Sequence, residues 1–273
     1  MNKPHPRIIS LEIQSLISIV ITAYREDNNI PLIYDELIQV FHSIRDRYRY
    51  EIIFVNDGSP DRTWHAIEQL CDTDTHVKGV NLSRNFGKEL AITAGLELSS
   101  GDVVITLDAD GQHPVDKIPD FLHEYEAGYE IVYNRRPETR DASFLKRYSS
   151  RLFYVLFNLL SEFKLEPHTT DYRLLSRDVV DAYLQFHEKN RMYRGLVDWL
   201  GFEKKALVFN AKKRIHGEAT YSYRRLLSLA INNLTSFSFF PLKFVGYFGL
   251  FVTVSSVCML FLQMLDKVGI LHF

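Results

Sequence analysis

Five short runs rich in β-branched residues recur along the first half of the chain, separated by segments long enough for helices. The runs are 16–22, 51–56, 77–83, 102–108 and 129–134. The segments between them predict helices at about 29–48, 61–72, 87–98 and 115–127. Because strands that alternate with helices form βαβ units, this order predicts an α/β fold with a mostly parallel sheet flanked by helices.

A long apolar run lies near the C-terminus. Residues 244–265 contain Gln263 as their only strongly polar side chain, and about 20 helical residues cross a hydrocarbon core. The run predicts a transmembrane helix, with a buried core helix as the alternative. Lys243 precedes the run and no signal-peptide pattern opens the chain, so the positive-inside rule predicts that the large N-terminal part faces the cytoplasm at the inner cell membrane. The ending at 266–273 suggests that the natural chain continues into a second transmembrane helix.

Between these two parts, segment 216–243 mixes Arg224 and Arg225 with apolar residues at spacings of three and four. This pattern predicts an amphipathic helix on the membrane surface, and a helix packed on the N-terminal domain is the alternative. The expected organisation is an extension at 1–15, an α/β domain at 16–215, the interfacial region at 216–243, the transmembrane helix at 244–265 and a tail at 266–273.

Polar side chains follow three of the predicted strands. Tyr24 and Glu26 follow the first run, Asp57 the second, and Asp108 and Asp110 the fourth. Because ligands bind beyond the carboxyl ends of strands in open α/β sheets, we expect these side chains to line one crevice.

The sequence argues against dinucleotide-binding proteins and against proteins that bind nucleic acid through their overall charge. No glycine lies between Leu16 and Gly58, so the G-x-G-x-x-G pattern of dinucleotide binding is missing after the first strand. The formal net charge of −2 gives no general attraction to nucleic acid.

The sequence "DADGQ" places Asp108, Asp110 and Gln112 directly after a buried strand. Two carboxylates that lie close together repel each other unless a cation lies between them. Carboxylate and amide oxygens suit a hard divalent ion, so the three residues predict a site for Mg²⁺ or Mn²⁺. A solvated turn with a helix N-cap is the alternative.

Seven motifs in one order give the chain a resemblance to a known family. They are "TAYRED", "VNDGSPDRT", "LSRNFGKELAITAGL", "SSGDVVITLDADGQHP", "DYRLLSR", "RGLVDWLGF" and "RIHGEATYSYRRLLSLA". Over residues 16–265 the chain resembles the family 2 glycosyltransferases, and within them the polyprenyl-phosphate sugar transferases, such as dolichyl-phosphate mannose synthases and bactoprenol glucosyltransferases. The resemblance implies a GT-A fold, an inverting reaction, a UDP- or GDP-linked sugar donor, a polyprenyl phosphate acceptor in the membrane, and a homo-oligomer.

The resemblance also implies roles for particular residues. Tyr24, Glu26 and Asp57 match positions that bind the base and ribose of the donor. Asp108, Asp110 and Gln112 match the cluster that binds the metal and the donor diphosphate. The chain departs from the family pattern at Thr22, Ala23 and Arg25, where Pro and Asn are usual, and at Ala219 and Thr220, where several relatives have Ser-Lys.

The acceptor sets a further requirement. A hydroxyl acceptor needs a base, whereas a lipid phosphate is already anionic and needs cations to orient it. We expect an acceptor clamp formed by Arg135, Arg136, Arg147, Arg151 and Arg214, with a solvated helix face as the alternative for most of them.

Asp110 and Asp171 are the predicted catalytic carboxylates. Asp171 is expected either to shape the site, by pairing with Arg173, or to act as the base for a hydroxyl of a lipid-linked saccharide. The first reading, with a polyprenyl phosphate acceptor at the cytoplasmic membrane face, is favoured.

Overall fold

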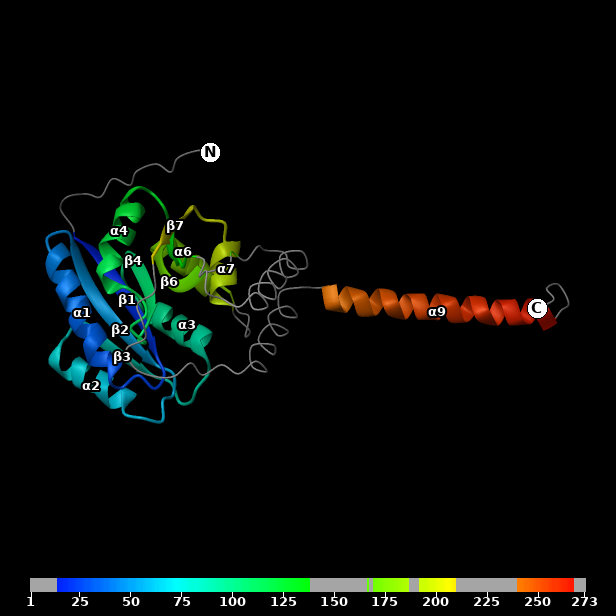
Figure 1. Ribbon diagram of the computed structural model, residues 1–273, viewed down its shortest axis with the longest axis horizontal. Coiled ribbons are helices and arrows are strands. Elements are labelled where there is room, and N and C mark those ends of the chain that lie inside the picture. The colour runs from blue at the N-terminus through cyan, green and yellow to red at the C-terminus, as the bar shows by residue number, and fades with distance from the viewer. Residues whose placement is uncertain (1–13, 138–165, 167–168, 187–191, 210–239, 268–273) are drawn as a thin grey trace. The chain divides into compact units, whose positions relative to one another are not determined.

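The computed structural model describes residues 14–137, 166, 169–186, 192–209 and 240–267 (Figure 1). The chain divides into two compact units, Met1–Lys146 with Leu165–Thr220, and Arg147–Lys164 with Tyr221–Phe273. The described part of the first unit is an α/β domain, and the described part of the second is one long helix.

The α/β domain is built on a seven-stranded sheet whose order is β3-β2-β1-β4-β6-β5-β7. Its strands are β1 Ser15–Ala23, β2 Tyr48–Asn56, β3 Val77–Asn81, β4 Val103–Asp108, β5 Ile131–Arg135, β6 Thr169–Ser176 and β7 Lys204–Val208. Strand β6 runs antiparallel to both of its neighbours, and the other paired strands are parallel. The mostly parallel sheet predicted from the sequence is therefore confirmed.

Helices cover both faces of this sheet. They are α1 Asn29–Ile44, α2 Thr63–Thr73, α3 Lys88–Leu98, the 3-10 helix η1 Val115–Lys117, α4 Ile118–Glu126, α6 Arg177–Leu184 and α7 Tyr193–Trp199. Side chains alternate along β1 because a strand has a period of two residues. Ile19 and Ile21 join the buried cluster that includes Leu37 of α1 and Phe121 of α4, whereas Val20 meets Gly95 of α3. Helix α3 therefore lies on the face opposite to α1 and α4.

The predicted strands correspond to β1 to β5, and the predicted helices to α1, α2, α3 and η1–α4. The predicted end of the first helix at residue 48 is wrong, because α1 ends at Ile44 and Tyr48 already pairs with Ser15 in the sheet. Trp199, the last residue of α7, is 55% exposed. Elements β6, α6, α7 and β7 were not predicted.

The second unit contributes helix α9, Phe240–Lys267. Within it, Val245–Met264 form a 20-residue stretch with a mean hydropathy of 2.0, long and apolar enough to cross a membrane. The hydroxyls of Thr253 and Ser256 donate to the carbonyls of Gly249 and Val252, one turn earlier, at 2.9 and 2.8 Å. Both hydroxyl groups are therefore satisfied within the helix. Residues 216–239 of the predicted interfacial region lie outside the described residues.

Candidate active site

The carboxyl ends of three adjacent strands form one edge of the sheet. Register places Ala23 beside Asn56 and Thr22 beside Asp108. The pairing continues past the strands, since the backbone N–H of Asp57 donates to the Ala23 carbonyl at 2.9 Å. Residues that follow β1, β2 and β4 are thus brought to the same edge, as the sequence predicted.

Asp57 follows β2 and lies next to the residues that lead into α3. Its carboxylate accepts the backbone N–H groups of Phe86 and Gly87 at 2.7 and 3.0 Å. Burial raises the pKa of Asp57, and the two amide hydrogen bonds offset only part of that rise. The carboxylate therefore fixes the loop that leads into α3.

The two residues predicted to follow β1 have different surroundings. Tyr24 is 39% exposed, and the Arg25 guanidinium lies 5.4 Å from its ring centre. Glu26 is buried, and its carboxylate accepts a hydrogen bond from the Asn29 side-chain amide at 2.5 Å. Tyr24 is therefore open to a ligand, while Glu26 holds the first turn of α1.

Asp108 ends β4 and has a cationic partner that sequence reasoning missed. The Lys88 ammonium lies 2.6 Å from Asp108 Oδ2, and the Thr22 hydroxyl donates to Oδ1 at 3.1 Å. The Asp108 backbone N–H donates to Nδ1 of buried His113 at 3.0 Å. Burial alone would raise the pKa of Asp108, but Lys88 and then His113 outweigh it and hold the pKa below its ordinary value.

The same ammonium contacts Asp171 on β6. Lys88 Nζ lies 2.5 Å from Asp171 Oδ2, and Arg194 Nε lies 3.0 Å from Oδ1. Burial by itself would raise the pKa of Asp171, but these two cations reverse the effect and hold the pKa well below its ordinary value. Asp171 is therefore a carboxylate that remains ionised.

The expected pairing of Asp171 with Arg173 is wrong. Arg173 is fully buried, and its Nη1 donates to Asp198 of α7 at 3.1 Å. Asp171 and Arg173 are two residues apart on β6, so their side chains lie on the same face of the sheet. However, Lys88 and Arg194 already flank the Asp171 carboxylate. The motif "RGLVDWLGF" thus supplies partners to both residues, Arg194 to Asp171 and Asp198 to Arg173.

Glu89, next to Lys88 in the first turn of α3, is a further group that sequence reasoning missed. Its carboxylate accepts the backbone N–H of Tyr193 at 2.7 Å and so links α3 to α7. Burial, and then the negative charge of Asp171, raises the pKa of Glu89 to about 7. The only sequence signal for Lys88 and Glu89 is that they follow Gly87 at the start of a predicted helix.

Asp110 and Gln112 form the turn beyond β4. Asp110 Oδ1 accepts the backbone N–H of Gln112 at 3.0 Å, and Gln112 Oε1 accepts Nη2 of Arg136 at 3.0 Å. Arg135 and Arg136 are exposed at the end of β5. One predicted acceptor residue, Arg136, is therefore joined directly to the predicted metal cluster. Arg147, Arg151 and Arg214 lie outside the described residues.

The side-chain oxygens at this turn are suitable ligands for a hard divalent ion. Asp108 and Asp110 offer carboxylate oxygens and Gln112 an amide oxygen, which is the ligand type that Mg²⁺ and Mn²⁺ prefer. Within the described residues, no group of three or more His, Cys, Asp or Glu side chains is arranged to hold a metal. The set is thus suited to an ion that takes its remaining ligands from a bound substrate.

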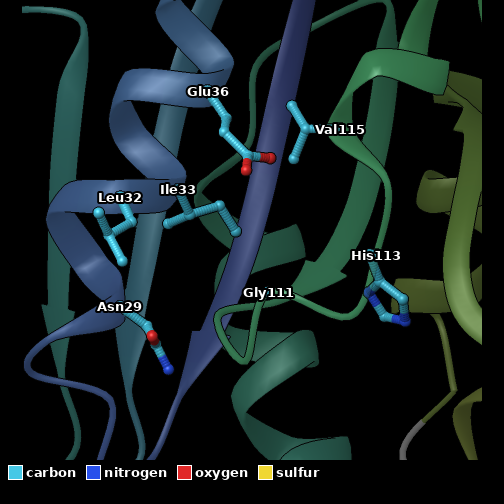
Figure 2. A pocket seen from close by; sticks show the side chains of 7 residues that line it. All are labelled: Asn29, Leu32, Ile33, Glu36, Gly111, His113 and Val115. Carbon is cyan, nitrogen blue, oxygen red and sulfur yellow. The ribbon is translucent and has the colours of Figure 1, made fainter. Parts of the chain in front are cut away.

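A pocket lies behind this turn, between α1 and the segment after β4 (Figure 2). Its lining residues are Asn29, Leu32, Ile33, Glu36, Gly111, His113 and Val115. Gly111 stands between Asp110 and Gln112 with a φ of +70°, a conformation that favours glycine. The pocket leaves space behind the backbone that carries Asp110 and Gln112, two of the three predicted metal ligands.

Residues 18–184 match the family model described as Glycosyl transferase family 2. The chain belongs to this family, and it is therefore a glycosyltransferase.

Two relatives show the extent of the match. The putative glycosyltransferase CsbB of Bacillus subtilis is 39% identical over 89% of this chain and 73% of its own length. The bactoprenol glucosyl transferase of Shigella phage SfV is 36% identical over 86% of this chain and 76% of its own length.

Solved structures support the same fold. Glucosyl-3-phosphoglycerate synthase from Mycobacterium tuberculosis, in complex with Mn²⁺, UDP and phosphoglyceric acid, has a TM-score of 0.52 and 18% identity, with 83% of this chain and 80% of that chain covered. TarS of S. aureus, in complex with UDP-GlcNAc, has a TM-score of 0.51 and 14% identity, with 81% and 65% covered. The expected GT-A-type fold is confirmed.

Proposed function

We propose that this glycosyltransferase moves one sugar from a nucleotide diphosphate donor to a polyprenyl phosphate at the cytoplasmic face of the inner membrane, with inversion at the sugar carbon. In a single displacement, the acceptor phosphate oxygen forms the new bond as the bond to the donor diphosphate breaks. The similarity to bactoprenol glucosyl transferases supports the acceptor class, and the fold shared with enzymes solved with UDP or UDP-GlcNAc supports the donor class.

The donor would bind at the carboxyl ends of β1, β2 and β4. Exposed Tyr24 is available to the base or ribose, with Glu26 and Asp57 assigned to the same part of the donor. Asp108, Asp110 and Gln112 would hold Mg²⁺ or Mn²⁺ against the diphosphate, where the ion supplies charge neutralisation for the leaving group.

One observation carries the choice of acceptor: both oxygens of Asp171 face cations, Lys88 at 2.5 Å and Arg194 at 3.0 Å. A carboxylate whose pKa is lowered in this way is a weak base, so it is unsuited to deprotonating a hydroxyl. A phosphate acceptor needs no base. Arg135 and Arg136 would orient it with Arg147, Arg151 and Arg214, and the contact of Arg136 with Gln112 would place its charge beside the diphosphate.

Helix α9 supports attachment to the membrane that contains such an acceptor. Lys243, near its start, supports a cytoplasmic position for the α/β domain under the positive-inside rule. We also propose that the segments of the chain end at residues 15, 215, 243 and 265, as the sequence predicts, and that the protein forms a homo-oligomer.

A donor screen tests the proposal. The full chain in detergent is mixed with Mg²⁺ or Mn²⁺, a short polyprenyl phosphate and a panel of UDP- and GDP-sugars, and sugar-lipid product is measured by mass. We expect product with one donor, and a loss of on the order of 10²-fold or more in kcat for Asp110→Asn, because a charged ligand at the leaving group is removed. Asp116→Asn, an exposed carboxylate on η1, is the control. Donor binding without any lipid product would contradict the proposed acceptor.

The hydroxyl-acceptor alternative now favours a different base. Glu89, with a pKa raised to about 7, suits proton abstraction near neutral pH better than Asp171 does. With a phosphate acceptor, Asp171→Asn should keep measurable activity, since no proton is removed. With a lipid-linked saccharide as acceptor, activity that Glu89→Gln lowers by 10²-fold to 10⁴-fold would support the alternative.

A further inference from the structure

Lys88 lies between two carboxylates, those of Asp108, a predicted metal ligand, and of Asp171. Its ammonium contacts Asp108 Oδ2 at 2.6 Å and Asp171 Oδ2 at 2.5 Å. The three residues come from three different elements, because Lys88 is the first residue of α3, Asp108 the last of β4 and Asp171 the third of β6. One flexible side chain therefore joins three parts of the fold at a single point.

The backbone places Lys88 there. Gly87, the N-cap of α3, has a φ of +99°, a conformation that glycine adopts without strain. The close approach of Gly95 to Val20 keeps α3 tight against β1. The start of α3 is thus fixed next to the end of β4, and the lysine stem has only to extend from it.

The charges around Lys88 are nearly balanced. Asp108 and Asp171 face it directly, Arg194 faces the far oxygen of Asp171, and Glu89 and His113 lie close enough to interact electrostatically with the group. Without the ammonium, two carboxylates would face each other across the space that it occupies, an arrangement that attracts another cation. A cation at this position weakens the attraction of Asp108 for a divalent ion, since like charges a few ångströms apart repel.

We propose that Lys88 is a positioning residue that neutralises Asp108 and Asp171 in the donor-free enzyme, so that a divalent ion binds tightly only together with the donor diphosphate. The inference rests on the proposed function, because it assumes that Asp108 belongs to a metal site. The inference also gives an order of binding. Lys88 keeps the attraction of the site for the metal weak, and the negative charge of the donor diphosphate then strengthens that attraction.

Binding of Mn²⁺ alone, followed by the electron paramagnetic resonance signal of free Mn²⁺, tests this without any sugar transfer. Lys88→Met keeps the length of the stem and removes the charge. We expect the Mn²⁺ Kd of the full chain in detergent to fall roughly tenfold in this variant, because a unit charge close to the ion is gone. Addition of UDP should lower the Kd strongly in the wild type and much less in the variant.

Two controls separate charge at the site from general effects. Lys78→Met removes another lysine that contacts a buried carboxylate, Glu51 at 2.6 Å, near the amino ends of β2 and β3, and it should leave the Mn²⁺ Kd unchanged. Lys88→Arg keeps the positive charge and should leave the Kd of Mn²⁺ alone within about threefold of the wild-type value, since the repulsion remains.

Lys88→Met leaves two carboxylates without this partner and can prevent folding. In that case Lys88→Met with Asp171→Asn is compared with Asp171→Asn alone, and the same roughly tenfold fall in Mn²⁺ Kd is expected. An unchanged or higher Kd in the folded variant overturns the inference but leaves the proposed sugar transfer intact. No Mn²⁺ binding by the wild type, with or without UDP, would contradict the metal site itself and the inference with it.

Discussion

At the scale of single residues, charged groups in this fold serve two different purposes at the two ends of the central strands. At the carboxyl ends, Lys88 and Arg194 contact carboxylates beside the proposed substrate site. Toward the amino ends, Glu51 on β2 is buried and fully engaged by the protein. It accepts from Ser18 at 2.5 Å, from the Ser100 backbone at 2.7 Å and from Lys78 at 2.6 Å. The Glu51 carboxylate therefore stabilises the fold and has no part in the proposed site.

Glu51 should make stability depend on pH in the acid range. Burial alone would raise its pKa, but the hydrogen bonds from Lys78, Ser18 and Ser100 outweigh it and hold the pKa at about 2, below the ordinary value of 4.5. A lowered folded-state pKa stabilises the protein above the ordinary value, and this stabilisation is lost as pH falls toward 2. We therefore expect Glu51→Gln to cost about 1–3 kcal/mol at pH 7 and progressively less below pH 4.5.

Urea denaturation at pH 7, 4.5 and 3 measures this difference. The wild type and the variant should have clearly separate midpoints at pH 7, and the separation should be smaller at pH 3, where part of the stabilisation has been lost. A separation that stays constant across the three pH values would mean that the charge of Glu51 is not the source of the stabilisation.

At the scale of elements, the contact between α3 and β1 positions the start of α3 and thus Lys88. A Cβ added at Gly95 would overlap the Val20 side chain. We expect Gly95→Ala to destabilise the fold by about 1–2 kcal/mol, because overpacking costs about 1–3 kcal/mol and the gain in helix propensity of up to about 1 kcal/mol offsets only part of it. It should also lower sugar transfer by moving α3.

Thermal unfolding followed by circular dichroism checks the Gly95 prediction. Glu97→Ala, an exposed change on the same helix, should leave Tm within about 1–2 °C of the wild-type value, since surface substitutions are usually within 0.5 kcal/mol. Equal Tm values for Gly95→Ala and the wild type would mean that α3 can shift away from β1 without loss.

The elements also show why part of the fold was readable from the sequence and part was not. Strands β1, β2 and β4 are apolar runs bounded by polar residues, so their ends, with Asp57, Asp108 and Asp110, could be predicted. Strand β6 is buried along its whole length although it contains Asp171 and Arg173. Its polar residues are accommodated by partners from α3 and α7, and such long-range pairs leave no local pattern.

The site followed the same division. Asp108, Asp110 and Gln112 were predicted because they lie next to one another along the chain. Lys88 and Arg194 were missed because they reach Asp171 from residues 83 positions before it and 23 positions after it. The sequence predicted that a metal ion would relieve the repulsion between Asp108 and Asp110. The structure places the Lys88 ammonium beside Asp108, and the metal site stays a prediction.

At the scale of the whole molecule, the chain combines an α/β domain of a sugar-transferring family with an apolar helix. The proposed acceptor explains the combination, because a polyprenyl phosphate keeps its tail in lipid while its phosphate is available to an enzyme at the surface. An enzyme attached to that membrane searches for its acceptor in two dimensions. Membrane attachment through α9 is thus a condition for the proposed activity, and it can be tested separately.

We expect the full chain to remain in the membrane pellet after extraction with alkaline carbonate, which removes proteins bound only at the surface. Arg substitutions at both Val254 and Val257, near the middle of the apolar stretch Val245–Met264, should move most of the protein to the supernatant. An arginine at the centre of a spanning helix costs about 2.5–3.5 kcal/mol on the insertion scale, and two of them exceed what the flanking apolar residues recover. Leu98→Arg, an exposed change on α3, should leave the chain in the pellet. Extraction of the wild-type chain itself would show that α9 does not span the bilayer, and the acceptor would then have to be reached from the surface by the α/β domain alone.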